Sequence, residues 1–135
     1  MRVTIPWKHV ASSNQRHARR GGRAHSWQYK RAKEAIHLHA LNQIRGERPH
    51  YPVGTLHASI ACFPPDARKR DVTNLPKGIL DALEGVMYDN DAQVVSLHVW
   101  RAEVDRDEPR VEVDVVPLNG AVRSLAGGDT PGEAA

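Results

Sequence analysis

The chain has 135 residues, of which 40% are hydrophobic and 26% are charged. This length allows one domain with a single core, and the ten glycines and nine prolines are too dispersed for a low-complexity chain. No apolar run reaches the ~20 residues of a membrane helix, and the N-terminus lacks a signal-peptide pattern. The single cysteine, Cys62, excludes an internal disulfide. We therefore expect a cytoplasmic protein with no membrane partner.

Positive charge is concentrated at the front of the chain. Residues 1–50 hold eleven Lys or Arg and two acidic residues, a net charge of +9, whereas residues 51–100 carry −2 and residues 101–135 carry −4. Such segregation indicates an anionic polymer as partner, with nucleic acid first. The alternative is a solvated basic loop that has no partner.

The first expected elements are a strand, a loop and a helix. Residues 2–6 alternate apolar and polar side chains and end in proline, which predicts a short strand. Residues 9–22 are rich in glycine and positive charge, so we expect a mobile loop that becomes ordered on phosphate. Residues 26–45 follow a helical period, with an apolar stripe of Ala32, Ile36, Ala40 and Ile44.

Three further strands are expected after this helix. Residues 56–63 are apolar on both faces, which predicts a central strand with Cys62 as a small core residue. Residues 92–104 and 110–117 both alternate, and we predict that they pair as an antiparallel hairpin. Together these elements predict an α+β fold with two main helices packed on a small mixed sheet. We expect one domain over residues 1–123 and a flexible tail over residues 124–135.

Between the second and third strands lies a predicted core-facing helix. Apolar residues recur there at four-residue intervals, at Leu75, Ile79, Leu83 and Met87. Pro76 suits the first turn of this helix, where its missing N–H is not needed, and Thr73 or Asn74 can cap it.

The residues around this helix carry the candidate chemistry. The segment before it is expected to be extended, so Asp71 and Thr73 share one face. Lys77 lies one turn into the helix, close to that face, and can pair with Asp81. If the strand that begins near residue 92 runs beside residues 56–63, Asp91 approaches Asp71.

Two converging carboxylates in a positive surround form a natural Mg²⁺ site, because this ion prefers oxygen ligands and keeps waters that a phosphate can displace. Such an ion can polarise a phosphodiester and generate hydroxide, and Lys77 could hold the phosphate. The alternative is purely structural. Asp71 and Thr73 would then cap a helix, residues 89–91 would form an ordinary turn, and Lys77 and Asp81 would form a surface ion pair.

The same stretch also carries a family pattern. The pattern consists of an acid-x-acid-Asn-Leu element, a lysine in the following helix, an Asp-Ala-Leu turn of that helix and a final Asp before Gln-Val-Val. These are residues 71–75, Lys77, residues 81–83 and residues 91–95. The pattern resembles the RusA family of Holliday junction resolvases, and weaker similarity extends over most of residues 3–117.

The resemblance implies a homodimeric endonuclease that nicks four-way and other branched DNA junctions symmetrically in recombination and repair. It implies Mg²⁺ as cofactor, with Mn²⁺ as the alternative ion, no small-molecule cofactor, and a bacterial or phage-infected cytoplasm. Asp71 and Asp91 would be catalytic metal ligands, Lys77 the catalytic lysine, and Asn74 a support for the helix start. We expect phosphate contacts from seven basic side chains: Arg16, Arg19, Arg20, Arg23, Arg68, Lys69 and Arg70.

One departure from the family pattern matters. The second acid of the acid-x-acid pair falls on Thr73, whose hydroxyl can ligate a metal weakly but brings no negative charge. Asp89 or Asp81 could compensate. This leaves a second hypothesis, a junction-binding or DNA-binding protein with weakened catalysis. A third is a plain scaffold or RNA-binding module.

Overall fold

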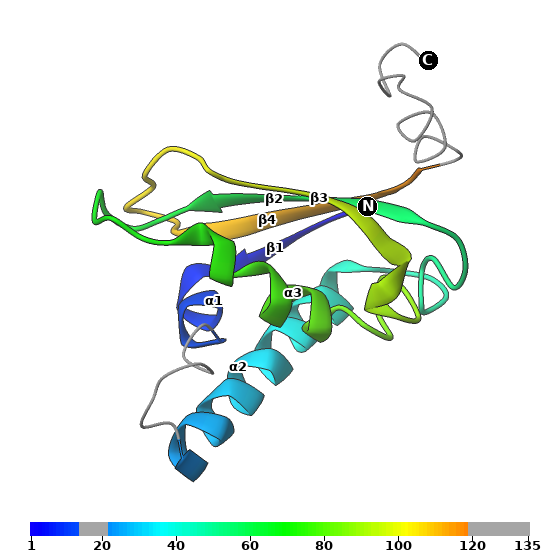
Figure 1. Ribbon diagram of the computed structural model, residues 1–135, viewed down its shortest axis with the longest axis horizontal. Helices are drawn as coiled ribbons and strands as arrows, with labels where there is room; N and C mark the ends of the chain where they lie inside the picture. The colour runs from blue at the N-terminus through cyan, green and yellow to red at the C-terminus, as the bar shows by residue number, and fades with distance from the viewer. Residues whose placement is uncertain (14–21, 119–135) are drawn as a thin grey trace.

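The computed structural model describes residues 1–13 and 22–118 of the chain (Figure 1). Four strands form one mixed sheet in the order β1-β4-β2-β3, and the three α-helices lie together on one side of it. The predicted α+β fold is therefore confirmed. The elements are β1 Arg2–Pro6, α1 Trp7–Ser13, α2 Gly22–Gln43, β2 Leu56–Phe63, the 3₁₀ helix η2 Val72–Asn74, α3 Pro76–Ala82, the 3₁₀ helix η3 Asp91–Gln93, β3 Val94–Arg101 and β4 Arg110–Pro117.

The core forms between the sheet and the helices from the predicted apolar stripes. Alternate residues of β2 and β4 point into it, and α2 and α3 each contribute one face. Cys62 is buried there, and burial raises the pKa of its thiol to about 11, as expected for an unreactive core residue. The predicted stripe residues of the helices and of β4 are all buried: Ala32, Ile36, Ala40, Ile44, Leu75, Ile79, Leu83, Met87, Val111, Val113 and Val115.

The predicted hairpin between the last two strands is wrong. β4 lies antiparallel between β1 and β2, whereas β3 pairs in parallel with the other side of β2. After β3 the chain continues in the same direction beside the end of β2, where the Ala102 N–H donates to the Cys62 carbonyl at 2.8 Å and the Asp105 N–H to the Pro64 carbonyl at 2.9 Å. The inward valines of β4 are fully buried, which suits a central strand. The apolar side chains of β3 remain partly exposed, which suits an edge strand.

The N-terminal loop prediction also needs correction. Part of residues 9–22 is helical, because α1 ends at Ser13 and α2 begins at Gly22, four residues before the predicted start. Trp7 and Val10 are buried against the core, and the Trp7 N–H donates to the Pro109 carbonyl at 3.1 Å. The stabilisation from burying these two side chains is larger than the cost of forming a helix from a polar sequence with low helix propensity. Residues 14–21 and the predicted tail, 124–135, lie outside the described residues.

The start of α3 differs from the prediction as well. Neither Thr73 nor Asn74 caps it; its N-cap is Leu75, without a side-chain hydrogen bond. Instead Asp71 caps the preceding turn η2, so Thr73 is in a 3₁₀ helix and not in an extended segment. The reason is local, since an Asp side chain readily accepts from the backbone N–H two residues ahead and turns the chain at that point.

Beyond α3, the chain turns sharply towards β3. Gly85 has φ +81°, a conformation that favours glycine, and its N–H donates to the Tyr88 carbonyl at 2.7 Å. Asp91 follows at the start of η3, directly before β3. Because β2 and β3 are parallel, the chain that leads to Asp71 leaves the sheet at the Phe63 end of β2, whereas Asp91 lies at the opposite end, where β3 begins beside Leu56, and α3 connects the two.

Candidate active site

Asp71, Thr73 and Asn74 form one hydrogen-bonded unit. One carboxylate oxygen of Asp71 accepts from the Thr73 N–H at 2.9 Å and from the Thr73 hydroxyl at 2.6 Å, and the other accepts from the Asn74 amide at 3.3 Å. The Thr73 hydroxyl and then its N–H lower the pKa of Asp71 below its usual range. Asp71 is therefore an exposed, ionised carboxylate whose orientation is set by its neighbours.

Asp91 has the opposite environment. Its N–H donates to the Glu84 carboxylate at 2.8 Å, and its own carboxyl group lies within hydrogen-bonding reach of the Asp81 and Glu84 carboxyl groups. Burial, followed by these two acidic neighbours, raises the pKa of Asp91 above its ordinary value. Three carboxyl groups thus meet at Asp91, and Asp71, the partner that the sequence predicts for it, is not among them.

Asp81 links this acidic cluster to the predicted catalytic lysine. The Lys77 ammonium lies 4.0 Å from the Asp81 carboxylate, as the spacing of four predicts, and the Tyr29 hydroxyl of α2 donates to the other Asp81 oxygen at 3.1 Å. The Lys77 side chain is 59% exposed and can still reach a substrate, whereas that of Asp81 is only 21% exposed. Lys77 and Asp91 are therefore brought together through Asp81.

The loop that carries Asp91 is fixed by Gln93 and Asn90. The Gln93 side-chain oxygen accepts from the N–H groups of Asp89 and Asn90 at 3.0 Å, and the Asn90 side chain accepts from the Ala92 N–H at 2.8 Å. The Gln93 amide also donates to two carbonyl groups in the loop before β2. Gln93 thus has a structural role, because it holds the loop that carries Asp91 in place. Among the described residues, no contact joins the Asp89 side chain to another acidic side chain.

The basic residues ahead of Asp71 divide into two kinds. Arg68 and Lys69 are exposed, which suits phosphate contacts. Arg70 is engaged within the protein, because its guanidinium lies 2.8 Å from the Asp66 carboxylate and 5.4 Å from the Trp7 ring centre. The other predicted contacts are not visible: Arg16, Arg19 and Arg20 lie outside the described residues, and Arg23 lies in the first turn of α2, where side chains are not described.

The predicted site thus consists of two halves joined by η2 and α3. Asp71, Thr73 and Asn74 form the first half, and Lys77 and Asp91 belong to the second. Among the described residues, no hydrogen bond or ion pair joins Asp71 to Asp91, and no group of three or more His, Cys, Asp or Glu side chains is placed to hold a metal ion by itself.

Sequence reasoning missed two members of the second half. Glu84 lies three residues after Asp81, a spacing that places both on one side of a helix end, so this signal was present in the chain. Tyr29 lies 52 residues before Asp81, and no local pattern connects the two.

The relationship to known proteins rests on the part of the chain that carries these residues. Residues 6–116 match the family model of endodeoxyribonuclease RusA, a span that runs from the end of β1 nearly to the end of β4 and includes both halves of the site. The chain belongs to the RusA family. RusA-family proteins are endodeoxyribonucleases that resolve Holliday junctions, and they generally depend on a divalent metal ion. No curated protein sequence matches the chain. None of its described helices is long and apolar enough to cross a membrane.

The RusA-family metal dependence can be compared with the donor groups of this chain. Asp91 lies with two other carboxyl groups, and burial together with these acidic neighbours raises its pKa, a cost that a bound cation would reduce. Mg²⁺ is usually held by only one or two carboxylates, with waters and phosphate oxygens completing its shell. The donor set around Asp91 therefore fits a hydrated divalent ion that shares its ligands with the substrate.

Proposed function

We propose that this RusA-family protein is a Mg²⁺-dependent endonuclease that nicks four-way DNA junctions symmetrically in recombination and repair. One observation carries the proposal: the Asp91 carboxyl group is packed against those of Asp81 and Glu84, beside Lys77, within the span that matches the family. Neighbouring carboxylates that are partly withdrawn from water repel one another, so such a cluster favours a site that binds a cation. The protein acts as one domain over residues 1–123, on DNA in the cytoplasm of a bacterial or phage-infected cell.

The residues of the site have distinct roles in this proposal. Asp71 and Asp91 hold the ion, Mg²⁺ or alternatively Mn²⁺, and the Thr73 oxygen assists through a lone pair because its proton is donated to Asp71. When bound, the ion supplies Lewis-acid activation of the phosphodiester and of a water nucleophile. Lys77 binds the phosphate and neutralises charge that develops on it. Asn74 keeps Asp71 oriented, and no small-molecule cofactor takes part.

The first test replaces a proposed ligand. Asp91→Asn keeps the size of the side chain but removes its charge, so nicking of a fixed four-way junction in Mg²⁺ should fall by at least ~100-fold. Junction binding in EDTA should be unchanged. A second readout is independent of cleavage: Mg²⁺ should raise the Tm of the wild-type protein and leave that of the variant unchanged. Asp89→Asn, two residues earlier and exposed, is the matched control and should retain both properties.

The outcome that contradicts the metal assignment is wild-type cleavage by Asp91→Asn. A linear duplex of the same sequence provides the substrate control, because a structure-selective nuclease cuts the junction and leaves the duplex intact. Equal affinity for the junction, the duplex and RNA would favour the plain nucleic-acid-binding module.

A second candidate function rests on Thr73. Its hydroxyl donates to Asp71 and adds no charge, which fits a junction-binding protein with weakened catalysis. Thr73→Asp restores the acid of the family pattern. If the wild-type protein is inert and this variant gains Mg²⁺-dependent cleavage, the binding-protein reading is correct; robust cleavage by the wild-type protein eliminates it.

A further inference from the structure

A groove of about 490 Å³ lies between α2 and the end of α3. Six residues line this α2–α3 groove: Lys30, Lys33, Glu34, His37, Leu38 and Ala82. The two helices are joined beside it by two hydrogen bonds. The Tyr29 hydroxyl donates to the Asp81 carboxylate at 3.1 Å, and His37 Nδ1 donates to the Ala82 carbonyl at 2.8 Å, since a carbonyl oxygen can only accept. None of the lining residues belongs to the proposed metal site.

Lys33 lies on the line of α2 that contacts α3. Residues four apart share one face of a helix, so Lys33 falls between Tyr29 and His37, the two α2 residues that hydrogen-bond to α3. Lys33 is half-buried, yet within residues 1–13 and 22–118 its ammonium group has neither a hydrogen bond nor an ion pair. A lysine is rarely withdrawn from water without a partner. A half-buried ammonium with no described partner points to an anionic ligand.

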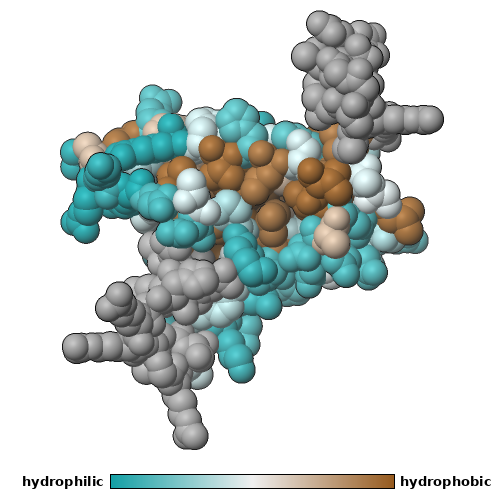
Figure 2. Space-filling model, in the orientation of Figure 1, coloured by the Kyte–Doolittle hydropathy of each residue, from teal (hydrophilic) through white to brown (hydrophobic). Residues whose placement is uncertain are grey.

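The charge of the groove fits the same kind of ligand. Lys30, three residues before Lys33 on the same face, is exposed and also has no ion pair with a described residue. Glu34 is the single acid among the six lining residues, so the two lysines leave a net positive charge. The described surface over α3 and the adjoining part of α2 is mainly hydrophilic, and the hydrophobic surface gathers over the sheet instead (Figure 2). These features favour a solvated polyanion over an apolar partner.

The groove borders the proposed active site. Ala82 directly follows Asp81, whose carboxyl group lies with that of Asp91. Lys33 is four residues from Tyr29, which touches Asp81, and this spacing corresponds to ~6 Å along α2 at ~1.5 Å per residue. Neighbouring phosphates of one DNA strand are separated by a similar step. A strand that has one phosphate at the acidic cluster can therefore present the next phosphate to Lys33.

We propose that the α2–α3 groove binds the DNA backbone beside the phosphate that is cut, with Lys33 and Lys30 as its phosphate ligands. This inference rests on the proposed function, because it takes the cluster around Asp91 as the place of cleavage. Lys77 neutralises the reacting phosphate, whereas Lys33 and Lys30 hold the strand next to it and fix how the strand crosses the cluster. Contacts to phosphate carry no base information, so the groove acts on any sequence.

The first test measures binding of a fixed four-way junction to the full chain in EDTA, by fluorescence anisotropy, and so requires no cleavage. Lys33→Met removes the charge and keeps an aliphatic side chain that can pack against α3. It should weaken binding by at least ~3-fold at low salt and reduce the slope of log affinity against log salt by ~1. Arg45→Met, at an exposed position just beyond the end of α2, is the matched control and should leave the affinity and the slope unchanged.

A variant of opposite sign separates a phosphate contact from a folding defect. Glu34→Gln removes the one acid of the groove and leaves both lysines in place, so it should tighten binding of the same junction at low salt. A damaged fold does not produce a gain in affinity. This variant therefore keeps the test decisive if Lys33→Met fails to fold.

A scan with single neutral methylphosphonates, placed one at a time along the strands next to the branch point, locates the contact. At one position the modification should weaken wild-type binding and leave Lys33→Met binding unchanged, because that contact is already lost. Wild-type affinity and slope in Lys33→Met, a Glu34→Gln variant that binds no more tightly, or a scan without such a position overturns the proposal. Failure of the nuclease proposal is a separate result: a protein that shows these contacts and cuts no junction retains the groove as a DNA site and loses the cleavage.

Discussion

At the scale of single residues, the two aspartates proposed to share an ion differ in their electrostatic surroundings. Asp71 is exposed and accepts hydrogen bonds from the Thr73 hydroxyl and N–H, which lower its pKa, whereas burial and two carboxyl neighbours raise the pKa of Asp91. Environments that separate the pKa values of two carboxyl groups give them different roles. Asp71 would be the more readily ionised ligand, and a bound cation would favour the charged form of Asp91.

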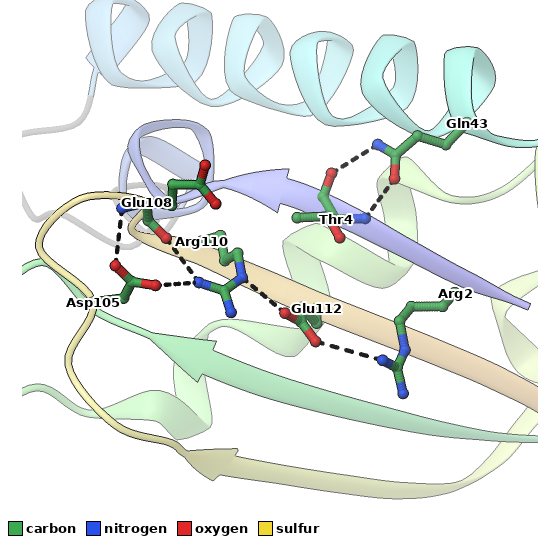
Figure 3. Close-up of polar contacts among 7 residues, drawn as sticks. All are labelled: Arg2, Thr4, Gln43, Asp105, Glu108, Arg110 and Glu112. Carbon is green, nitrogen blue, oxygen red and sulfur yellow. Dashed lines mark hydrogen bonds and ion pairs between the residues drawn. The ribbon is translucent and has the colours of Figure 1, made fainter.

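Thr73→Val tests this account of Asp71. The variant removes the hydroxyl donor, the larger cause of the shift, and keeps the N–H donor, so the pKa of Asp71 should rise but stay below its ordinary value. Carboxyl-carbon NMR titration measures the change, and Asp105, whose lowered pKa depends on Glu108 and Arg110, is the internal control (Figure 3). Because the folded pKa is depressed, the stabilisation is present above the unfolded pKa and is lost as the pH falls through the folded pKa. An unmoved Asp71 pKa would show that the hydroxyl bond does not form.

At the scale of elements, α3 positions the acidic cluster, and Tyr88 anchors its end. The Tyr88 side chain is fully buried, and its hydroxyl donates to the Leu80 carbonyl at 2.6 Å. That carbonyl is among the last of α3, where the helix no longer supplies an N–H partner. Burial, with the charges of Asp91 and its acidic neighbours, raises the pKa of Tyr88, so the phenol remains a donor.

Tyr88→Phe should therefore destabilise the protein by about 1–3 kcal/mol, because the Leu80 carbonyl is left buried without a partner. Denaturant unfolding of the full chain measures the change in the free energy of unfolding. Tyr51→Phe is the matched control: its hydroxyl lies 3.4 Å from the Val115 carbonyl, a weaker contact, so the loss should be smaller. Equal losses for the two variants would argue against Tyr88 as the anchor of α3.

At the scale of the whole molecule, the charge distribution matches a protein that holds DNA beside a negatively charged site. The first fifty residues carry +9, and the exposed Arg68 and Lys69 lie directly before Asp71. Cationic side chains release counterions from DNA, so the affinity for a DNA junction should fall steeply as the salt concentration rises, whatever the base sequence of the junction.

Replacement of both Arg68 and Lys69 by Ala should weaken junction binding and reduce the slope of log affinity against log salt by about 1–2, since up to two phosphate contacts are lost. Fluorescence anisotropy in EDTA measures the slope without cleavage. Arg45→Ala, an exposed arginine just beyond the end of α2, is the matched control and should leave the slope unchanged. A double variant with the wild-type slope would place the DNA path elsewhere.

The sequence by itself determined the α+β class, the buried stripes and the family, because periodic burial and the spacing around Asp71, Lys77 and Asp91 are local properties of the chain. It also predicted the Lys77–Asp81 pair, which needs only helical spacing. Only the tertiary structure decided that β4 pairs with β1 and β2 and not with β3, that Val10 makes a helix of part of the predicted loop, and that Tyr29 and Glu84 join the acidic cluster. These features depend on contacts between residues far apart in the chain or on how a turn closes, and local patterns do not encode which buried surfaces will meet.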